Sequence, residues 1–278
     1  VRLLTDPQRA AEGRGIVSLA NHISVLDEPL MWGTLPRSLF QQERTVRWSL
    51  GASDIIFKNE LCRWFFHRGQ TWEVFRGQGI YQPAINHAIT RLGAGSWVHI
   101  FPEGRVNLSR STRLRRFKWG VARLILEAPK TPAVVPLWLT GFDQVMPEHR
   151  RAPRFLPRLG ADITVSFGEP IAPALLQPYV DLYTQREHMS VDDVAHALPA
   201  LSSRTSSDDL YPTRPATLRP EDSPTYAALR SHLAAFLREE LARVGDDATH
   251  RFGLGPSEKQ LAHRADLIGS DYKTDVPT

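Results

Sequence analysis

Cysteine and long apolar runs are almost absent from this sequence of 278 residues. The single thiol, Cys62, excludes an intramolecular disulfide and a zinc site built from clustered cysteines. No run reaches the roughly 18 apolar residues that a helix needs to span a bilayer. We therefore expect no conventional transmembrane helix, no metal site and no cofactor. The sequence begins at Val1 instead of a methionine, so we expect a preceding segment to be missing.

Several catalytic and ligand-binding motifs are missing as well. The lack of Gly-x-Ser-x-Gly disfavours the common type of α/β serine hydrolase. There is no His-Glu-x-x-His and no Walker loop, and RGQGIYQP (76–83) lacks the third glycine of a dinucleotide-binding fingerprint. Motifs that read RNA or DNA are also absent, so we expect no nucleic-acid partner.

Positive charge is concentrated in the first 170 residues. They contain 23 Lys and Arg against 14 Asp and Glu, whereas residues 171–278 contain 11 against 16. The basic part of the chain therefore suits an anionic partner, such as a phosphorylated metabolite or an anionic membrane surface. The apolar fraction of 42% is sufficient for a buried core.

Short β-branched apolar runs alternate with helical patterns in this basic part of the chain. Such alternation predicts an α/β fold with a central mixed or parallel sheet that is flanked by helices. The predicted strands are 15–20, 45–50, 72–75, 97–101, 133–139 and 162–167. The predicted helices are 52–66, 80–93 and 117–128.

The remainder of the chain differs in character, although we interpret residues 1–278 as one domain with its core at about 15–183. Two domains are the alternative at this length. Residues 184–224 are rich in Ser, Pro, Asp and Arg and predict a long, partly disordered polar insertion. Residues 225–245 predict an amphipathic helix, which we expect to pack on the core instead of lying on a membrane. Residues 246–278 are predicted to form a polar tail.

Two pairs of histidine and aspartate have the same spacing, His22 with Asp27 and His188 with Asp193. The first pair directly follows a predicted strand, where α/β folds place their sites, whereas the second lies in the predicted insertion and is discounted. If the chain turns after His22, Asp27 can accept a hydrogen bond from one imidazole nitrogen while the other faces a substrate. The alternative is that Asp27 caps the following helix and His22 is a solvated loop residue.

A second motif, Phe-Pro-Glu-Gly at 101–104, follows another predicted strand. Pro102 and Gly104 force a turn, which presents Glu103 at the end of the strand or simply ends the strand. The run 105–118 that follows contains no acid and predicts either an anion-binding surface, including one for lipid phosphate, or a solvated face. Its basic residues are Arg105, Arg110, Arg113, Arg115, Arg116 and Lys118.

Aromatic and basic residues are interspersed over residues 36–66, a composition that suits the headgroup boundary of a membrane. The alternative is a core helix together with a strand. The residues that we expect at a membrane interface are Trp48, Ile55, Ile56, Phe57, Trp64, Phe65 and Phe66.

The order of these motifs resembles the glycerolipid acyltransferase superfamily, and most closely its phospholipid–lysophospholipid transacylases. The resemblance covers about residues 15–170 and rests on NHISVLDEPLMWG, FFHRGQTWEVFRGQGIYQ, GSWVHIFPEGRVN, RFKWGVARLI and VVPLW. It implies a sheet flanked by helices with a membrane-seated surface. It also implies transfer of a fatty acyl group between a phospholipid and a lysophospholipid without coenzyme A, with monolysocardiolipin as a principal acceptor and cardiolipin as the product.

The resemblance also implies roles for individual residues. His22 and Asp27 match the catalytic His-x-x-x-x-Asp motif, Glu103 and Gly104 match the Phe-Pro-Glu-Gly motif, and Arg76 matches an arginine near the acceptor's phosphate. Histidine can take a proton from the attacking hydroxyl and return one to the departing hydroxyl. We expect Glu103 to hold the acceptor or the architecture and not to act as a nucleophile.

The implied setting is a mitochondrial membrane, contacted from one side that faces the intermembrane space, and the oligomeric state is left open. Two alternatives share the fold. One is an acyl-CoA-dependent lysophospholipid acyltransferase, and the other is a non-catalytic adaptor for anionic membranes.

Overall fold

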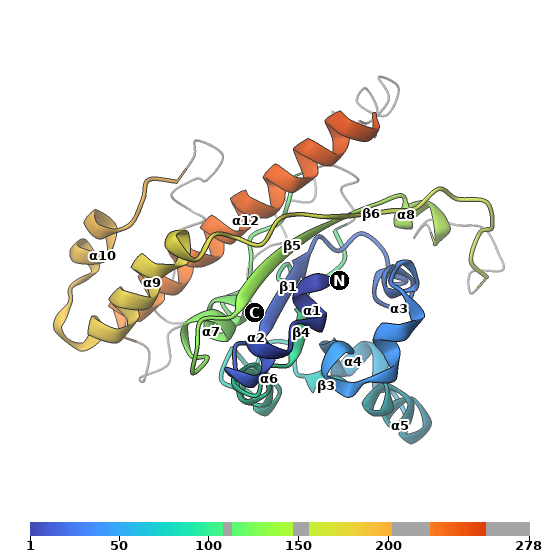
Figure 1. The fold of residues 1–278 in the computed structure, drawn as a ribbon, viewed down its shortest axis with the longest axis horizontal. Helices are drawn as coiled ribbons and strands as arrows, with labels where there is room; N and C mark the ends of the chain where they lie inside the picture. The colour runs from blue at the N-terminus through green and yellow to red at the C-terminus, as the bar shows by residue number, and fades with distance from the viewer. Residues whose placement is uncertain (108–112, 147–155, 202–222, 254–278) are drawn as a thin grey trace.

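The computed structural model of the chain describes residues 1–107, 113–146, 156–201 and 223–253, and a six-stranded sheet lies at its centre (Figure 1). The strand order is β3-β2-β4-β1-β5-β6. All neighbouring strands are parallel except β6, which runs antiparallel to β5 at one edge. The strands are β1 (Ile16–Ala20), β2 (Trp48–Ala52), β3 (Thr71–Val74), β4 (Trp97–Ile100), β5 (Ala133–Thr140) and β6 (Thr164–Phe167).

Helices cover both faces of the sheet, so strand β1 is buried along its whole length. Alternate residues of a strand point to opposite faces, and here Val17 and Leu19 enter one apolar core while Ile16 and Ala20 enter the other. This is why the strand has the continuous apolar pattern that is typical of a covered parallel sheet.

The larger core lies between the sheet and four helices. These are α6 (Pro83–Gly93), α7 (Gly120–Leu126), α9 (Pro173–Gln185) and α12 (Pro224–Phe252). Helix α12 packs on β5, β6, α7 and α9 and runs diagonally along that side of the molecule (Figure 1). The helices α6, α9 and α12 each have proline in the first turn, where its missing N–H costs no hydrogen bond.

Short helices cover the other face and one edge. The helices are α1 (Arg2–Thr5), α2 (Pro7–Ala11), α3 (Asp27–Met31), α4 (Ser53–Ile56), α5 (Glu60–Arg68) and α8 (Phe142–Val145). Three 3-10 turns, Trp32–Thr34, Arg37–Gln41 and Glu43–Thr45, complete this side between α3 and β2. Helices α4 and α5 lie against β2 and β3, towards the edge formed by β3 (Figure 1).

The predicted α/β fold with a mixed sheet flanked by helices is confirmed, and the differences are local. The predicted helix 52–66 is two helices, because Asn59 caps the start of α5 by accepting a hydrogen bond from the Cys62 amide. The predicted helix 225–245 is longer at both ends and packs on the core as expected. Within the described part of the chain, no helix has both the length and the apolar composition to cross a bilayer.

The prediction of a partly disordered insertion at 184–224 is wrong for its first part. Residues Arg186–His188 form a 3-10 turn, and Val191–Ala197 form helix α10, which packs on α12 through buried Val194. Ser190 and Asp193 form a capping box at the start of α10. Asp193 therefore caps a helix and belongs to no site with His188. Residues 202–222 of the insertion and 254–278 of the tail lie outside the described residues.

Candidate active site

The candidate site lies at the carboxyl end of β1, where the chain leaves the sheet. Asn21, the first residue after the strand, is buried and continues the ladder with its side chain. Its amide nitrogen donates to the carbonyl of Leu139 at 3.0 Å, and its amide oxygen accepts from the Leu139 N–H at 2.7 Å. The next residue, His22, is therefore held at a defined position beyond the strand end, between the ends of β4 and β5.

The imidazole of His22 is hydrogen-bonded to the carboxylate of Asp27, with 2.8 Å between Nδ1 and Oδ2. A carboxylate can only accept, so Nδ1 carries the proton of the neutral imidazole and Nε2 keeps its lone pair. The His22 side chain is 20% exposed, whereas that of Asp27 is completely buried. The contact expected from the spacing is present, and it leaves the lone pair of Nε2 free of the Asp27 carboxylate.

Asp27 does more than orient the imidazole. Its Oδ2 also accepts from the amides of Ile23 and Ser24, at 2.7 and 2.9 Å, which closes the loop between the histidine and the helix. These donors precede Asp27, so the alternative in which Asp27 caps the following helix α3 is wrong. Burial raises the pKa of Asp27 above its usual value, and the bond and charge of His22 oppose that rise.

Glu103 reaches the same loop from the end of β4. Its Oε1 accepts from the backbone N–H of His22 at 3.1 Å, and its Oε2 accepts from the Asn107 side chain at 3.0 Å and the Arg115 amide at 2.9 Å. The backbone N–H of Asn107 in turn donates to the backbone carbonyl of His22 at 2.6 Å. Both polar groups of the His22 backbone are thus bound by the turn that follows β4.

The position of Glu103 decides between the two roles expected for it. The side chain is 1% exposed and all its hydrogen bonds named above are internal, so it holds the architecture and does not present a carboxylate to an acceptor. Burial raises its pKa, while the amides that it binds oppose the rise. Gly104 lies at the exposed end of the turn with a φ of +72°, a conformation that glycine adopts without strain.

Two aromatic residues behind His22 were not anticipated from the sequence. The ring of Phe101 stacks on the imidazole of His22, with 4.3 Å between centroids, and meets His99 edge-on at 4.7 Å. His99 is fully buried, and its Nδ1 lies 2.8 Å from the hydroxyl of Ser18. Burial lowers the pKa of His99 to about 4, so this imidazole is neutral at physiological pH. His22 therefore packs on Phe101, and the imidazole on the other side of Phe101 is uncharged.

Arg76 lies on the loop that follows β3, and buried Gln82 closes this loop. The Gln82 amide accepts from the Phe75 N–H at 2.8 Å and donates to the Phe75 carbonyl at 2.9 Å. The Arg76 guanidinium is bound in bidentate fashion by Asp54, with Nε–Oδ1 and Nη2–Oδ2 distances of 2.9 and 2.7 Å. Exposed ion pairs contribute only about 0.2–1 kcal/mol, so another anion can replace this partner.

The basic run expected to bind anions folds back on the Phe-Pro-Glu-Gly turn. The Lys118 amide donates to the carbonyl of Pro102 at 2.7 Å. Burial and the charges of Arg115 and Arg76 lower the pKa of Arg105, which places Arg76 close to the run. Burial and three neighbouring arginines lower the pKa of Lys118. The basic cluster, as we define it, comprises Arg105, Arg115, Arg116 and Lys118. Arg113 is exposed on the same segment, and Arg110 lies outside the described residues.

The apolar residues expected at a membrane interface differ in their exposure to solvent. Phe57 is buried, and Trp48 is half-buried where it stacks on Trp72 with 4.4 Å between centroids, so these two do not belong to an exposed surface. Ile56 and Phe66 are also partly buried. The exposed group, which we name the α4–α5 apolar surface, consists of Ile55, Leu61, Trp64 and Phe65. Leu61 was not among the residues expected there.

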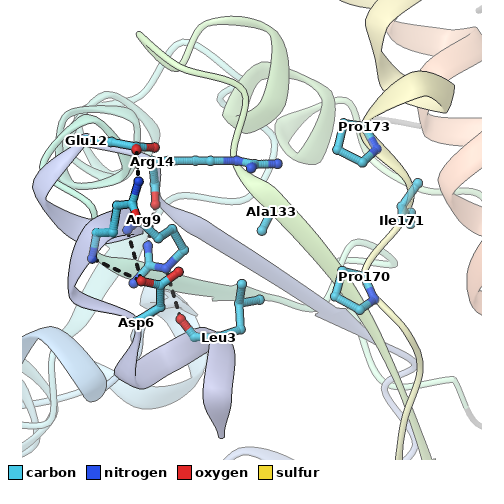
Figure 2. A pocket seen from close by; sticks show the side chains of 10 residues that line it. Leu3, Asp6, Arg9, Glu12, Arg14, Ala133, Pro170, Ile171 and Pro173 are labelled. Carbon is cyan, nitrogen blue, oxygen red and sulfur yellow. Dashed lines mark hydrogen bonds between the residues drawn. The ribbon is translucent and has the colours of Figure 1, made fainter.

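A cavity of about 380 Å³ lies at the opposite end of the strands (Figure 2). Ala133, the first residue of β5, lines it together with Arg9, Arg14 and Ile171. Arg9 is buried there and donates to the carbonyls of Leu3, Arg14 and Gly95, so its guanidinium holds the amino-terminal helices on the sheet. None of the predicted site residues lines this cavity, and we do not assign the site to it.

Comparisons with known proteins agree with an α/β acyltransferase fold. A family model described as Acyltransferase matches residues 3–140. The chain is 31% identical over 274 residues to Tafazzin from Saccharomyces cerevisiae, covering 85% of this chain and 68% of that protein. It is 38% identical over 170 residues to Tafazzin from Drosophila melanogaster, covering 61% of this chain. It is 40% identical over 171 residues to N-acylphosphatidylethanolamine synthase from Arabidopsis thaliana, also covering 61%.

The chain spans only part of two of these relatives, 44% of the fly protein and 60% of the plant protein. The region that the family model matches contains the loop of His22 and Asp27 and the turn of Glu103.

Proposed function

The chain belongs to the glycerolipid acyltransferase family that includes the tafazzins, and from this membership we propose that it moves a fatty acyl group between a phospholipid and a lysophospholipid without coenzyme A. The observation that carries the proposal is the His22–Asp27 pair. Its imidazole is fixed through Nδ1 at the end of β1, and Nε2 is left as the base. Monolysocardiolipin is the proposed principal acceptor and cardiolipin the proposed product.

The proposed reaction begins when Nε2 of His22 takes the proton of the acceptor's free hydroxyl. The oxygen attacks the ester carbonyl of the donor. As the bond from the carbonyl carbon to the donor's glycerol oxygen breaks, the protonated imidazole gives its proton to that oxygen, which becomes the free hydroxyl of the new lysolipid. Buried Asp27 stabilises the imidazolium that exists between the two steps. No covalent intermediate with the protein is needed when both lipids are bound together, although two half-reactions with a retained lysolipid satisfy the same proton balance.

We assign lipid phosphate contacts to the cations beside the site. Arg76 and the basic cluster, with Arg113, lie around the turn of Glu103 and Gly104. This turn and His22 both follow the carboxyl ends of parallel strands. Arginine binds phosphate oxygens through paired N–H groups, so these side chains can hold headgroups while the ester linkages reach Nε2. Arg110 belongs to the same run and is proposed on its sequence position alone.

Attachment to an anionic membrane is proposed to occur through the α4–α5 apolar surface. Its exposed aromatic and aliphatic side chains are accompanied by Lys58 and Arg68, and aromatic residues with cations suit the headgroup boundary. Contact from one side of the membrane requires no spanning helix. A mitochondrial membrane, on the side of the intermembrane space, is the proposed location.

The proposal is tested by supplying monolysocardiolipin with a labelled diacyl phospholipid, in the presence and absence of acyl-CoA. We expect labelled cardiolipin in both conditions; product only with acyl-CoA would establish the coenzyme-dependent alternative instead. The name of the plant relative suggests a second acceptor, the amine of phosphatidylethanolamine, and an N-acylated product in the same assay would favour that function.

The substitution His22→Ala separates an enzyme from a membrane adaptor. It removes the base but leaves the backbone contacts with Glu103 and Asn107 in place, so we expect transfer to disappear while liposome binding persists. Transfer at the wild-type rate would refute the role of His22.

A further inference from the structure

The Arg76–Asp54 pair places an acid directly on a cation of the proposed phosphate site. The carboxylate of Asp54 occupies the two N–H groups of Arg76, Nε–H and Nη2–H, that a phosphate would use. The two side chains are 40% and 62% exposed, so both charges can be reached from solvent. A ligand that enters here meets a positive and a negative charge side by side.

The neighbouring acid, Glu73, does not take part in this pair. It accepts from Arg63 at 2.7 Å and from the Ser53 hydroxyl at 2.6 Å, which fixes both of its oxygens. Asp54 is therefore the carboxylate that a headgroup at Arg76 would meet. The basic cluster lies near Arg76, and its arginines lower the pKa of Lys118.

Charge complementarity distinguishes two classes of phospholipid at Arg76. A net anion, such as a phosphatidylglycerol headgroup, can take these two N–H groups of Arg76 only by displacing Asp54, and at the other N–H groups it adds a second negative charge beside Asp54; both arrangements bring two like charges close together. A zwitterionic headgroup, with phosphate and ammonium, can exchange partners with the pair so that all four charges stay compensated. Two like charges about 4 Å apart lower a binding constant by about five-fold even in water, and by more where water is partly excluded.

We propose that Arg76 and Asp54 form a subsite for a zwitterionic phospholipid headgroup, in which Arg76 binds the phosphate and Asp54 binds the ammonium group. This inference rests on the proposed function, because that function brings a lipid phosphate to Arg76. It makes Asp54 a residue that determines specificity. It assigns the zwitterionic lipid of the exchange to the Arg76–Asp54 subsite.

A binding measurement tests the subsite without relying on catalysis. Short-chain dihexanoyl phosphatidylcholine and dihexanoyl phosphatidylglycerol, below their critical micelle concentrations, are titrated into the full chain by calorimetry. We expect Asp54→Asn to weaken binding of the choline lipid and strengthen binding of the glycerol lipid, which changes the ratio of the two affinities at least five-fold. The matched control is Glu60→Gln, which removes the same charge from exposed Glu60 on neighbouring α5 and leaves the ratio unchanged.

Each alternative has its own result. An unchanged ratio in Asp54→Asn would overturn the inference and reduce the pair to a surface ion pair. Stronger binding of both lipids would also overturn it, because Asp54 would then only compete with phosphate. If Asp54→Asn does not fold, Asp54→Ser is titrated in its place, and an unchanged ratio in that variant overturns the inference as well.

An exchange assay then connects the subsite to the reaction. Monolysocardiolipin is held constant as the acceptor, and the donor is phosphatidylcholine or phosphatidylglycerol with the same acyl chains. We expect wild-type protein to favour the choline donor, and Asp54→Asn to lower that preference at least five-fold. Absence of exchange with every donor would refute the proposed function and leave the binding result to judge the subsite. Exchange without any effect of Asp54→Asn on donor preference would refute the inference alone.

Discussion

Glu103 is the residue at which the architecture of the site can be tested most directly. The substitution Glu103→Gln preserves the size of the side chain but replaces one accepting oxygen by an NH2 group. Three N–H donors, from His22, Asn107 and Arg115, now face only one accepting oxygen. At least one buried donor must lose its partner and point at another donor. We expect the substitution to lower the free energy of unfolding and to release the His22 loop.

The size of the effect follows from these contacts. A hydrogen bond to a charged group contributes about 1.5–3 kcal/mol, and a buried donor without a partner costs about 1–3 kcal/mol. We therefore expect Glu103→Gln to lower the free energy of unfolding by about 2–4 kcal/mol. A shift of His22 by about 1 Å lowers a rate by about 100-fold, so we expect a loss of that order in kcat.

The assay combines urea unfolding, followed by circular dichroism, with acyl transfer to monolysocardiolipin. Glu60→Gln is the control, since it makes the same chemical change on a side chain that is 92% exposed. We expect the control to unfold within about 0.5 kcal/mol of the wild type. If Glu103→Gln behaved like this control in both stability and kcat, Glu103 would not hold the loop, and the assignment of an architectural role would be wrong.

Three further predictions concern other parts of the molecule. Asp27→Asn can keep its oxygen at the Oδ2 position, where it still accepts from His22, Ile23 and Ser24, but it removes the charge that stabilises the imidazolium, so we expect kcat to fall by about 100-fold or more with liposome binding intact; a loss below ten-fold would contradict the dyad. His99 has a pKa of about 4 in the folded protein and 6.5 when unfolded, so its neutral form stabilises the fold above pH 6.5, and this contribution is lost as the pH falls towards 4. Wild-type protein should therefore lose about 3 kcal/mol more unfolding free energy than His99→Gln across that range in urea titrations, and parallel curves would refute the burial argument. Replacing Trp64 and Phe65 together by Ser should weaken binding to anionic liposomes in sedimentation assays by at least about ten-fold. The control Phe167→Ser, which changes a similarly exposed aromatic residue on β6, should leave liposome binding unchanged. Equal losses in the two variants would show that the α4–α5 apolar surface is not the attachment site.

Strands and turns could be predicted from the sequence where the local residue pattern matches the burial of the segment in the fold. The run that became β1 is apolar and β-branched, and it ends at a polar residue, so both the strand and the position of His22 beyond it could be predicted. The turn at Pro102 and Gly104 was predictable for the same reason, because both residues restrict the backbone. The order of these motifs along the chain was sufficient to identify the family.

The partners of the site residues could not be predicted, because they come from distant segments. No local pattern indicates that the Glu103 carboxylate would bind the amides of His22 and Arg115, or that Arg76 would pair with Asp54. Helix α10 was missed because a polar composition hid its capping box, although Ser-x-x-Asp before a short apolar pattern is a signal for a helix start. In both cases the signal consists of one or two side chains instead of a periodic pattern.

The contact between Glu103 and His22 also sets an order of assembly. The two residues are 81 positions apart, so His22 and Asp27 leave the ribosome well before the turn that binds them has been made. Until β4 pairs with β1, the loop that holds the catalytic motif lacks the acceptor for its own backbone N–H. A nascent or truncated chain that ends before the turn therefore carries the motif without the contact that fixes its backbone.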